Sequence, residues 1–120
     1  MTEVVRVAAH AKINLFLRIL ARDSSGWHQL ETAFALLELA DELTARRSGS
    51  PGAVTLEVDG PDLGPADENL AVRAARLVLE ATGGRHGVAL RLVKRIPVRA
   101  GLGGGSADAA AALHAVNALA

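Results

Sequence analysis

The sequence predicts an α+β domain, because strand patterns and helix patterns are both present in its 120 residues. Alternating apolar residues open the chain, a helical repeat of apolar residues follows Asn69, and a strand, a glycine-rich loop and a second helix come last. Half of the residues are hydrophobic, so a single domain of this length can bury a core.

The composition disfavours several classes of protein. The 13 basic and 13 acidic residues balance, so no net charge draws the domain to nucleic acid or to an anionic membrane. The absence of cysteine excludes disulfides and thiolate metal sites. No run approaches the roughly 18 apolar residues of a membrane span, and charged residues interrupt the N-terminal segment. We therefore expect a cytoplasmic protein that has no leader peptide.

The first half of the chain is mainly strand-like. Residues 4–21 are rich in Val, Ile, Leu and Phe, and we expect two strands with a break near residues 9–11. Residues 22–26 carry Asp, Ser and Gly, which predicts a turn before a loop. Residues 30–47 are ambiguous: their Ala, Leu and Glu content favours a helix, whereas apolar residues at alternate positions favour a strand.

The second half alternates between strand and helix. A short strand is predicted over residues 54–58, and a helix begins at Leu70 and ends near Gly83. Residues 87–96 alternate as a strand, which ends before Pro97 because proline has no N–H to donate. The last helix is expected from Ser106 to the end of the chain, where no stop signal is found.

The stretch IPVRAGLGGGSADAA, residues 96–110, joins that strand to that helix. Consecutive glycines let backbone N–H groups turn toward an anion, and a helix N-terminus adds partial positive charge. The P-loop and dinucleotide motifs both fail here, since no Lys follows the last glycine and Ser106 stands where the dinucleotide pattern needs glycine. On the residues alone, a phosphate site and a tight turn with Ser106 as N-cap both stay open.

The pattern P-x-x-x-G-L-G-G-G-S-x-D-A-A, residues 97–110, closely resembles the phosphate loop of the GHMP kinases. Three more motifs of that family match in the same order: AKINLFL at residues 11–17, Gly-Trp-His at 26–28, and Glu-Asn-Leu at 68–70. The triple glycine resembles the members that phosphorylate a cytidine diphosphate-linked methylerythritol. The resemblance covers nearly the whole chain.

The resemblance implies the GHMP-kinase N-terminal fold, with ribosomal-protein-like left-handed β-α-β units and helices on one face of a mixed sheet. It implies that residues 30–39 form a strand, against their helix propensity. It also implies that residues 1–120 are an incomplete ATP-binding domain. The family's general base, an aspartate in a G-A-D-x-P motif, has no counterpart here. We therefore expect the chain alone to lack activity.

The implied reaction moves the γ-phosphoryl group of ATP, with Mg²⁺, to the 2-hydroxyl of that substrate in the non-mevalonate isoprenoid pathway. By resemblance, Lys12 stabilises the charge on the transferred group. From its position alone, Lys12 either extends to solvent or meets an anion. Asn14, on the same strand face, would orient the substrate, or else is only a hydrogen-bonded polar residue of the strand. Trp27 and His28 would recognise its cytosine by stacking and hydrogen bonding, or else simply close a loop.

The remaining implied site residues surround ATP. Asn69 would lie beside the adenine, or act only as the N-cap of the next helix. Asp108 is expected as a helix-start residue, and Lys94 is either a surface charge or part of the nucleotide pocket. Ala107 replaces a serine that many members carry, so the metal ligands stay unassigned. The loop residues implied to bind ATP are Pro97, Gly101, Leu102, Gly103, Gly104, Gly105 and Ser106, and the last four would hold its phosphates.

Two alternative functions stay open. One is another GHMP kinase, of the homoserine or mevalonate type, which the Trp27-His28 pair and the triple glycine disfavour. The other is a non-catalytic nucleotide- or RNA-binding module, since related β-α-β units occur in translation proteins. Balanced charge and only three aromatic residues disfavour RNA: Phe16, Trp27 and Phe34.

Overall fold

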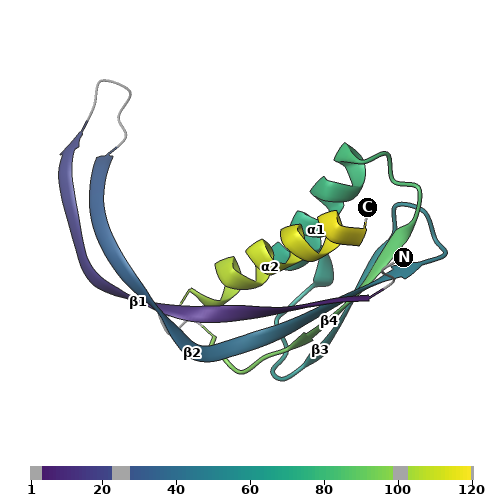
Figure 1. Cartoon of the computed structure of the whole chain (residues 1–120), viewed down its shortest axis with the longest axis horizontal. Coiled ribbons are helices and arrows are strands. Elements are labelled where there is room, and N and C mark those ends of the chain that lie inside the picture. The colour runs from purple at the N-terminus through teal and green to yellow at the C-terminus, as the bar shows by residue number, and fades with distance from the viewer. Residues whose placement is uncertain (1–3, 23–27, 99–102, 120) are drawn as a thin grey trace.

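The computed structural model describes residues 4–22, 28–98 and 103–119, with the backbone alone described for residues 14–22 and 28–34 (Figure 1). The elements follow in chain order as β1 (Val4–Arg22), β2 (His28–Ser48), β3 (Val54–Asp59), the 3-10 turn η1 (Ala66–Glu68), α1 (Leu70–Ala81), β4 (Gly87–Val93) and α2 (Gly104–Leu119).

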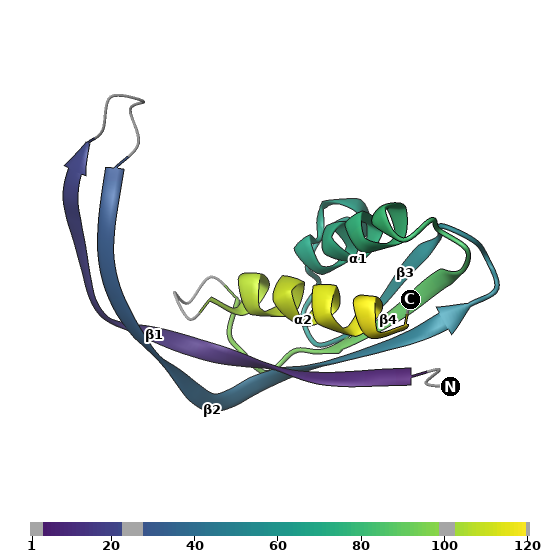
Figure 2. The same ribbon diagram turned by 45° about the horizontal axis from the view of Figure 1, so that its top comes forward.

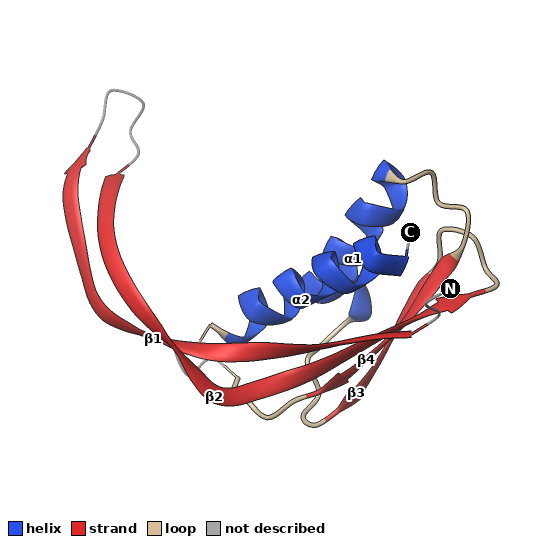
Figure 3. Ribbon diagram, viewed as in Figure 1, coloured by secondary structure: helices blue, strands red, loops and turns tan. Residues whose placement is uncertain are grey.

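The four strands form one mixed sheet in the order β1-β2-β4-β3. β1 pairs antiparallel with β2, and β2 pairs antiparallel with β4. β3 and β4 are parallel and are connected through α1. Both helices cover the same face of the sheet, as Figures 2 and 3 show. The expected α+β class and the mixed sheet with helices on one face are confirmed.

β1 and β2 continue past the helices as a two-stranded arm that curves away from the rest of the domain (Figure 1). The predicted break near residues 9–11 is wrong, because β1 is one strand of 19 residues. Its register against β2 shifts between His10 and Lys12, which is the signature of a bulge. A bulge bends a strand without ending its pairing. The interrupted alternation in the sequence indicates an irregular position but does not distinguish a bulge from a break between two strands.

β2 settles the ambiguity of residues 30–47, all of which lie in this strand. The strand prediction for residues 30–39 is confirmed, and the strand extends to Ser48. β2 pairs with β1 on one side, and residues 42–48 also pair with β4 on the other. Pairing with β1 along most of the strand, and with β4 over residues 42–48, outweighs the modest helix preference of Ala, Leu and Glu.

The core lies between the sheet and the two helices. Alternate residues of β4, namely Val88, Leu90 and Leu92, share one face, as predicted, and are buried in one cluster with residues of both helices. α1 begins at Leu70, and Gly83 follows its C-cap residue, which confirms that helix. α2 contributes small and apolar side chains to the same cluster: Ala111, Ala112, Ala115, Val116 and Leu119. Alanines on this face let α2 lie close to α1 and the sheet.

Two predicted boundaries differ from the structure on either side of the glycine loop. β4 ends at Val93 rather than Ile96, because the N–H groups of residues 95 and 96 turn to a side chain described below. α2 begins at Gly104 rather than Ser106, which places Ser106 inside the first turn and rules it out as the N-cap. Among the described residues, no helix is long and apolar enough to cross a membrane.

Candidate functional site

The described end of the glycine loop leads directly into α2. Gly103 has a φ of +71°, in the left-handed region, and its carbonyl accepts a hydrogen bond of 2.9 Å from the N–H of Ala107. By helix geometry, the first N–H groups of α2 have no carbonyl one turn earlier within the helix. Gly105 and Ser106, in this first turn, are exposed. Such N–H groups, together with the positive end of the helix dipole, are able to attract an anion.

Lys12 of β1 lies across Gly103. A Cβ atom on Gly103 would stand 2.8 Å from Cε of Lys12 and 3.1 Å from its Cγ. The half-buried lysine stem therefore packs against backbone that only glycine can provide. Two motifs that are distant in sequence meet at this point.

Lys94 follows β4 and reaches the other side of the helix start. A Cβ atom on Gly104 would stand 2.9 Å from Nζ of Lys94 and 3.1 Å from Cγ2 of Ile96. A larger residue than glycine would therefore push α2 away from the end of β4.

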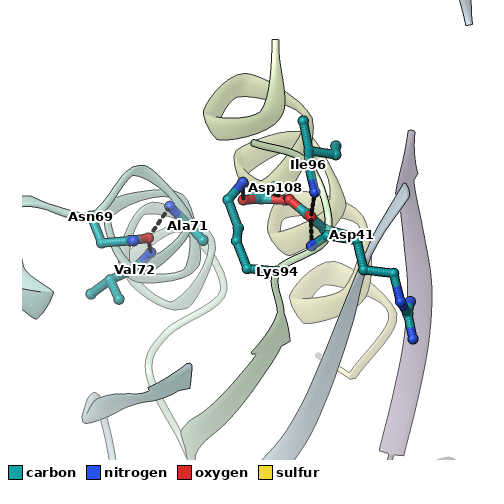
Figure 4. A network of polar contacts seen from close by, with 8 residues as sticks. Asp41, Asn69, Ala71, Val72, Lys94, Ile96 and Asp108 are labelled. Atoms are coloured by element: carbon teal, nitrogen blue, oxygen red, sulfur yellow. Dashed lines mark hydrogen bonds and ion pairs between the residues drawn. The ribbon is translucent and has the colours of Figure 1, made fainter. Parts of the chain in front are cut away.

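The ammonium of Lys94 binds two carboxylates (Figure 4). Its Nζ lies 2.6 Å from Oδ2 of Asp41 and 3.0 Å from Oδ2 of Asp108. All three side chains are at most 5% exposed. Lys94 is thus not a surface charge, and Asp108 does more than start a helix. We call Asp41, Lys94 and Asp108 the buried triad.

Asp41 also binds backbone. Its Oδ1 accepts hydrogen bonds from the N–H of Arg95 at 2.7 Å and from that of Ile96 at 2.8 Å. These are the N–H groups that leave the β4 ladder, which explains why the strand ends early. The triad therefore joins β2, the segment after β4 and α2.

The pKa values of the triad are shifted by burial and by mutual contacts. Burial raises the pKa of Asp108 to about 7, and the Asp41 carboxylate adds to the rise while Lys94 opposes it. Burial acts to raise the pKa of Asp41, but hydrogen bonds to Asp108, to the backbone and to Lys94 hold that pKa below its usual value. Burial acts to lower the pKa of Lys94, but the two carboxylates keep it above its usual value.

Asp108 therefore titrates near neutral pH beside a charged pair. Its Oδ1 is buried and accepts no hydrogen bond from the described residues. A proton on this carboxyl would let it donate to Asp41. The triad is close to neutral when Asp108 is protonated and carries one negative charge when it is not.

Asn69 acts as the N-cap of α1. Its Oδ1 accepts hydrogen bonds from the N–H of Ala71 at 2.9 Å and of Val72 at 3.4 Å (Figure 4). The start of α1 also lies beside the start of α2, since a Cβ atom on Gly105 would stand 3.8 Å from Cδ1 of Leu70. Asn69 is thus a structural cap close to the glycine loop.

The other predicted site residues are described only in part. Pro97 is exposed, before the loop. Asn14 pairs with Phe34 in the arm, next to Lys12, and nothing is described of its side chain. His28 is the first residue of β2, paired with Arg22 at the outer end of the arm and on the order of 25 Å along the strand from Lys12. Three predicted residues lie outside the described part: Trp27, Gly101 and Leu102.

The described residues contain no group of three or more His, Asp or Glu side chains placed to hold a metal ion. The two buried aspartates are already bound to Lys94. The backbone N–H groups at the start of α2 are suited to phosphate, whereas protein donors for Mg²⁺ are not assembled among the described residues. Mg²⁺ binds readily through substrate phosphates.

Asp41 is the site residue that sequence reasoning missed. A strand over residues 30–47 places Asp41 on the same face as Leu43 and Ala45, both of which are buried. A carboxylate on a buried face requires a cationic or N–H partner. This signal exists only if residues 30–47 form a strand, because alternate residues share a face in a strand and not in a helix.

Comparison with known proteins finds similar chains. The family profile "GHMP kinases N terminal domain" matches residues 69–120. A protein of Pelotomaculum thermopropionicum named 4-diphosphocytidyl-2-C-methyl-D-erythritol kinase is 50% identical over 114 residues, which are 95% of this chain and 39% of that protein. The chain thus spans about two-fifths of the length of the curated relatives that it matches.

Solved structures show the same fold. The crystal structure of a 4-(cytidine 5'-diphospho)-2C-methyl-D-erythritol kinase matches with a TM-score of 0.78 and 48% identity, over 96% of this chain and 40% of that one. A homoserine kinase from Cytophaga hutchinsonii matches with a TM-score of 0.73 at 22% identity, over 99% of this chain and 36% of that one. The latter supports the fold alone.

Proposed function

Since this chain has the fold of the GHMP-kinase N-terminal domain, we propose that it is the ATP-binding part of a cytoplasmic kinase for a cytidine diphosphate-linked methylerythritol. The kinase would transfer the γ-phosphoryl group of ATP to the 2-hydroxyl of that alcohol, a step of the non-mevalonate isoprenoid pathway. The observation that carries the proposal is the packing of Lys12 against Gly103, which unites two motifs of the family at one helix N-terminus.

The phosphate loop is the first part of the mechanism. Gly103, Gly104, Gly105 and Ser106 would hold the ATP phosphates through backbone N–H groups and the Ser106 hydroxyl. The helix dipole of α2 would favour the negative charge at this position. Pro97, Gly101 and Leu102 complete the loop by motif, and Asn69 would lie beside the adenine. Mg²⁺, carried in with the nucleotide, would neutralise phosphate charge.

Lys12 is proposed as the catalytic residue of this chain. Its stem lies on Gly103, so its ammonium would be available to a phosphoryl group held at the start of α2. A cation there stabilises the negative charge on the transferred group and lowers the pKa of the attacking hydroxyl. Catalysis then consists mainly of positioning and charge stabilisation.

The substrate would lie along the arm. Asn14, Trp27 and His28 are proposed to orient it, with the last two at the cytosine. A cytosine joined through ribose and diphosphate to a four-carbon alcohol is a long molecule, which suits contacts that are spread from the arm to Lys12. The name of the 50% identical relative supports this substrate over homoserine or mevalonate.

The general base is proposed to come from a G-A-D-x-P segment, which these 120 residues do not contain. The isolated chain would then bind ATP without turning it over. A chimaera tests both statements: this chain would replace the matching N-terminal segment of the Pelotomaculum thermopropionicum kinase. We expect the chimaera to phosphorylate the cytidine diphosphate-linked alcohol and the isolated chain not to do so. Preference of the chimaera for homoserine or mevalonate would overturn the substrate assignment.

A further inference from the structure

The buried triad connects the two ends of the glycine loop. On one side, Asp41 accepts the N–H groups of Arg95 and Ile96, directly before Pro97. On the other side, Asp108 in α2 binds the ammonium of Lys94 at 3.0 Å. The same ammonium lies 2.6 Å from Asp41. The chain between Pro97 and Gly103 is therefore anchored at both ends by one cluster of charges.

The anchor before the loop sets the direction in which the chain leaves the sheet. Ile96 is 1% exposed, so its N–H must find an acceptor inside the protein. Asp41, on the neighbouring strand β2, is the acceptor for this N–H and for that of Arg95. A carboxylate that binds two successive N–H groups fixes both peptide planes at once.

The anchor after the loop sets the position of the helix start. Asp108 lies one turn into α2 and is buried, so its bond to Lys94 holds this turn against the end of β4. Gly104 lies so close to Nζ of Lys94 that little room is left between the first turn of α2 and the Lys94 side chain. A shift of Lys94 would therefore move the N–H groups of the first turn.

We propose that Asp41, Lys94 and Asp108 are positioning residues that hold the phosphate loop in its binding geometry, so that phosphate affinity depends on an ion cluster beneath the loop. The proposal rests on the proposed function for the identity of the ligand. A buried ion pair that served folding alone would affect stability without a specific effect on the loop.

The test compares Asp41→Asn with Leu43→Ala. Asparagine keeps the size of the side chain but removes the charge opposite Lys94. Leu43 is a fully buried residue two positions along the same strand, so Leu43→Ala destabilises the core without breaking the triad. Both variants are studied in the whole chain, at a temperature at which each is folded by circular dichroism.

The first readout is amide hydrogen exchange at Ala107, whose N–H binds the carbonyl of Gly103. We expect Asp41→Asn to raise this exchange at least tenfold relative to the amides of α1, although Asp41 lies on β2 and Ala107 on α2. Leu43→Ala should change the exchange at Ala107 and the exchange of the α1 amides by the same factor. The proposal would be overturned if the exchange at Ala107, relative to the α1 amides, changed equally in the two variants.

The second readout is the affinity for inorganic tripolyphosphate by calorimetry. We expect the affinity of the Asp41→Asn variant for tripolyphosphate to fall at least tenfold. The affinity of the Leu43→Ala variant should stay within about twofold of that of the wild-type chain. If the wild-type chain binds neither tripolyphosphate nor ATP, the proposed function fails. Exchange at Ala107 still tests whether the buried triad positions the start of α2. If Asp41→Asn does not fold, Asp108→Asn replaces it, with a smaller loss expected because Lys94 keeps Asp41. Unchanged exchange in that variant would contradict the proposal.

Discussion

Nζ of Lys94 lies 2.6 Å from Oδ2 of Asp41, with both side chains buried, and thereby ties the segment after β4 to the neighbouring strand β2. The same ammonium binds Asp108 of α2. Strand β2, the segment after β4 and helix α2 thus meet at one cation. Stability, pH dependence and loop geometry should all respond to this cluster.

Replacement of Lys94 by methionine should destabilise the domain strongly. The variant keeps the volume of the stem but leaves Asp41 and Asp108 buried without their cation, which costs about 3 kcal/mol or more. Urea unfolding measures the loss. Arg91→Met is the control, because Arg91 is mostly exposed and lies 3.9 Å from Asp59, so its loss should stay below about 1 kcal/mol. Similar losses in the two variants would contradict a buried role for Lys94.

Stability should fall as the pH rises from about 4 to about 7. Asp108 has its pKa raised by burial to about 7, so in this window the folded chain holds a proton that the unfolded chain has released. The shift from 3.8 to about 7 corresponds to at most roughly 4 kcal/mol. Asp41, whose pKa is lowered, changes stability only at pH values below this window, and Lys94, whose pKa is raised, only at pH values far above it.

The matched variant for this pH effect is Asp108→Asn, measured by urea unfolding between pH 5 and pH 8. Asparagine does not titrate, so most of the slope should disappear. An unchanged slope would show that another group is responsible.

Asn69→Ala should lower the free energy of unfolding by about 1 kcal/mol, because two N–H groups of α1 lose their acceptor. Asn69→Asp keeps an acceptor oxygen and should retain stability. If Asn69 also donates to the adenine, Asn69→Asp should weaken ATP binding while the thermal midpoint stays unchanged. Equal stability of the alanine and wild-type chains would contradict the capping role.

Gly103→Ala and Gly105→Ala should differ although both glycines belong to one loop motif. Gly103 has a φ of +71° and the stem of Lys12 above it, so alanine there should cost about 1–2 kcal/mol. Gly105 lies in α2, where a Cβ atom would meet only Leu70 at 3.8 Å, so alanine should leave stability equal or higher. Thermal unfolding compares the two, and equal losses would refute the distinction.

Much of the fold was predictable from local patterns. The alternation in β4 and the helical repeat after Asn69 are set by residues a few positions apart, and both were predicted correctly apart from the end of β4. β2 is different, because its composition favours a helix while its alternation favours a strand. Pairing with β1, and with β4 over residues 42–48, decides for the strand, and this pairing is not a local property.

The site was predictable only in part for a similar reason. The glycine loop and Lys12 were identified by motif, and the structure brings them into contact. The triad was missed because Asp41, Lys94 and Asp108 lie on three different elements, and only the assembled sheet brings them together. The early end of β4 has the same origin, since it depends on a carboxylate from another strand.

The most direct test of the account follows the amide resonances of the isolated chain by NMR during titration with ATP and Mg²⁺, with adenosine as the comparison. We predict that ATP shifts the amides of Gly104, Gly105 and Ser106, and that adenosine, which lacks phosphates, leaves them in place. Amides of α2 that do not move with ATP, or that move equally with adenosine, would contradict a phosphate site at the start of this helix.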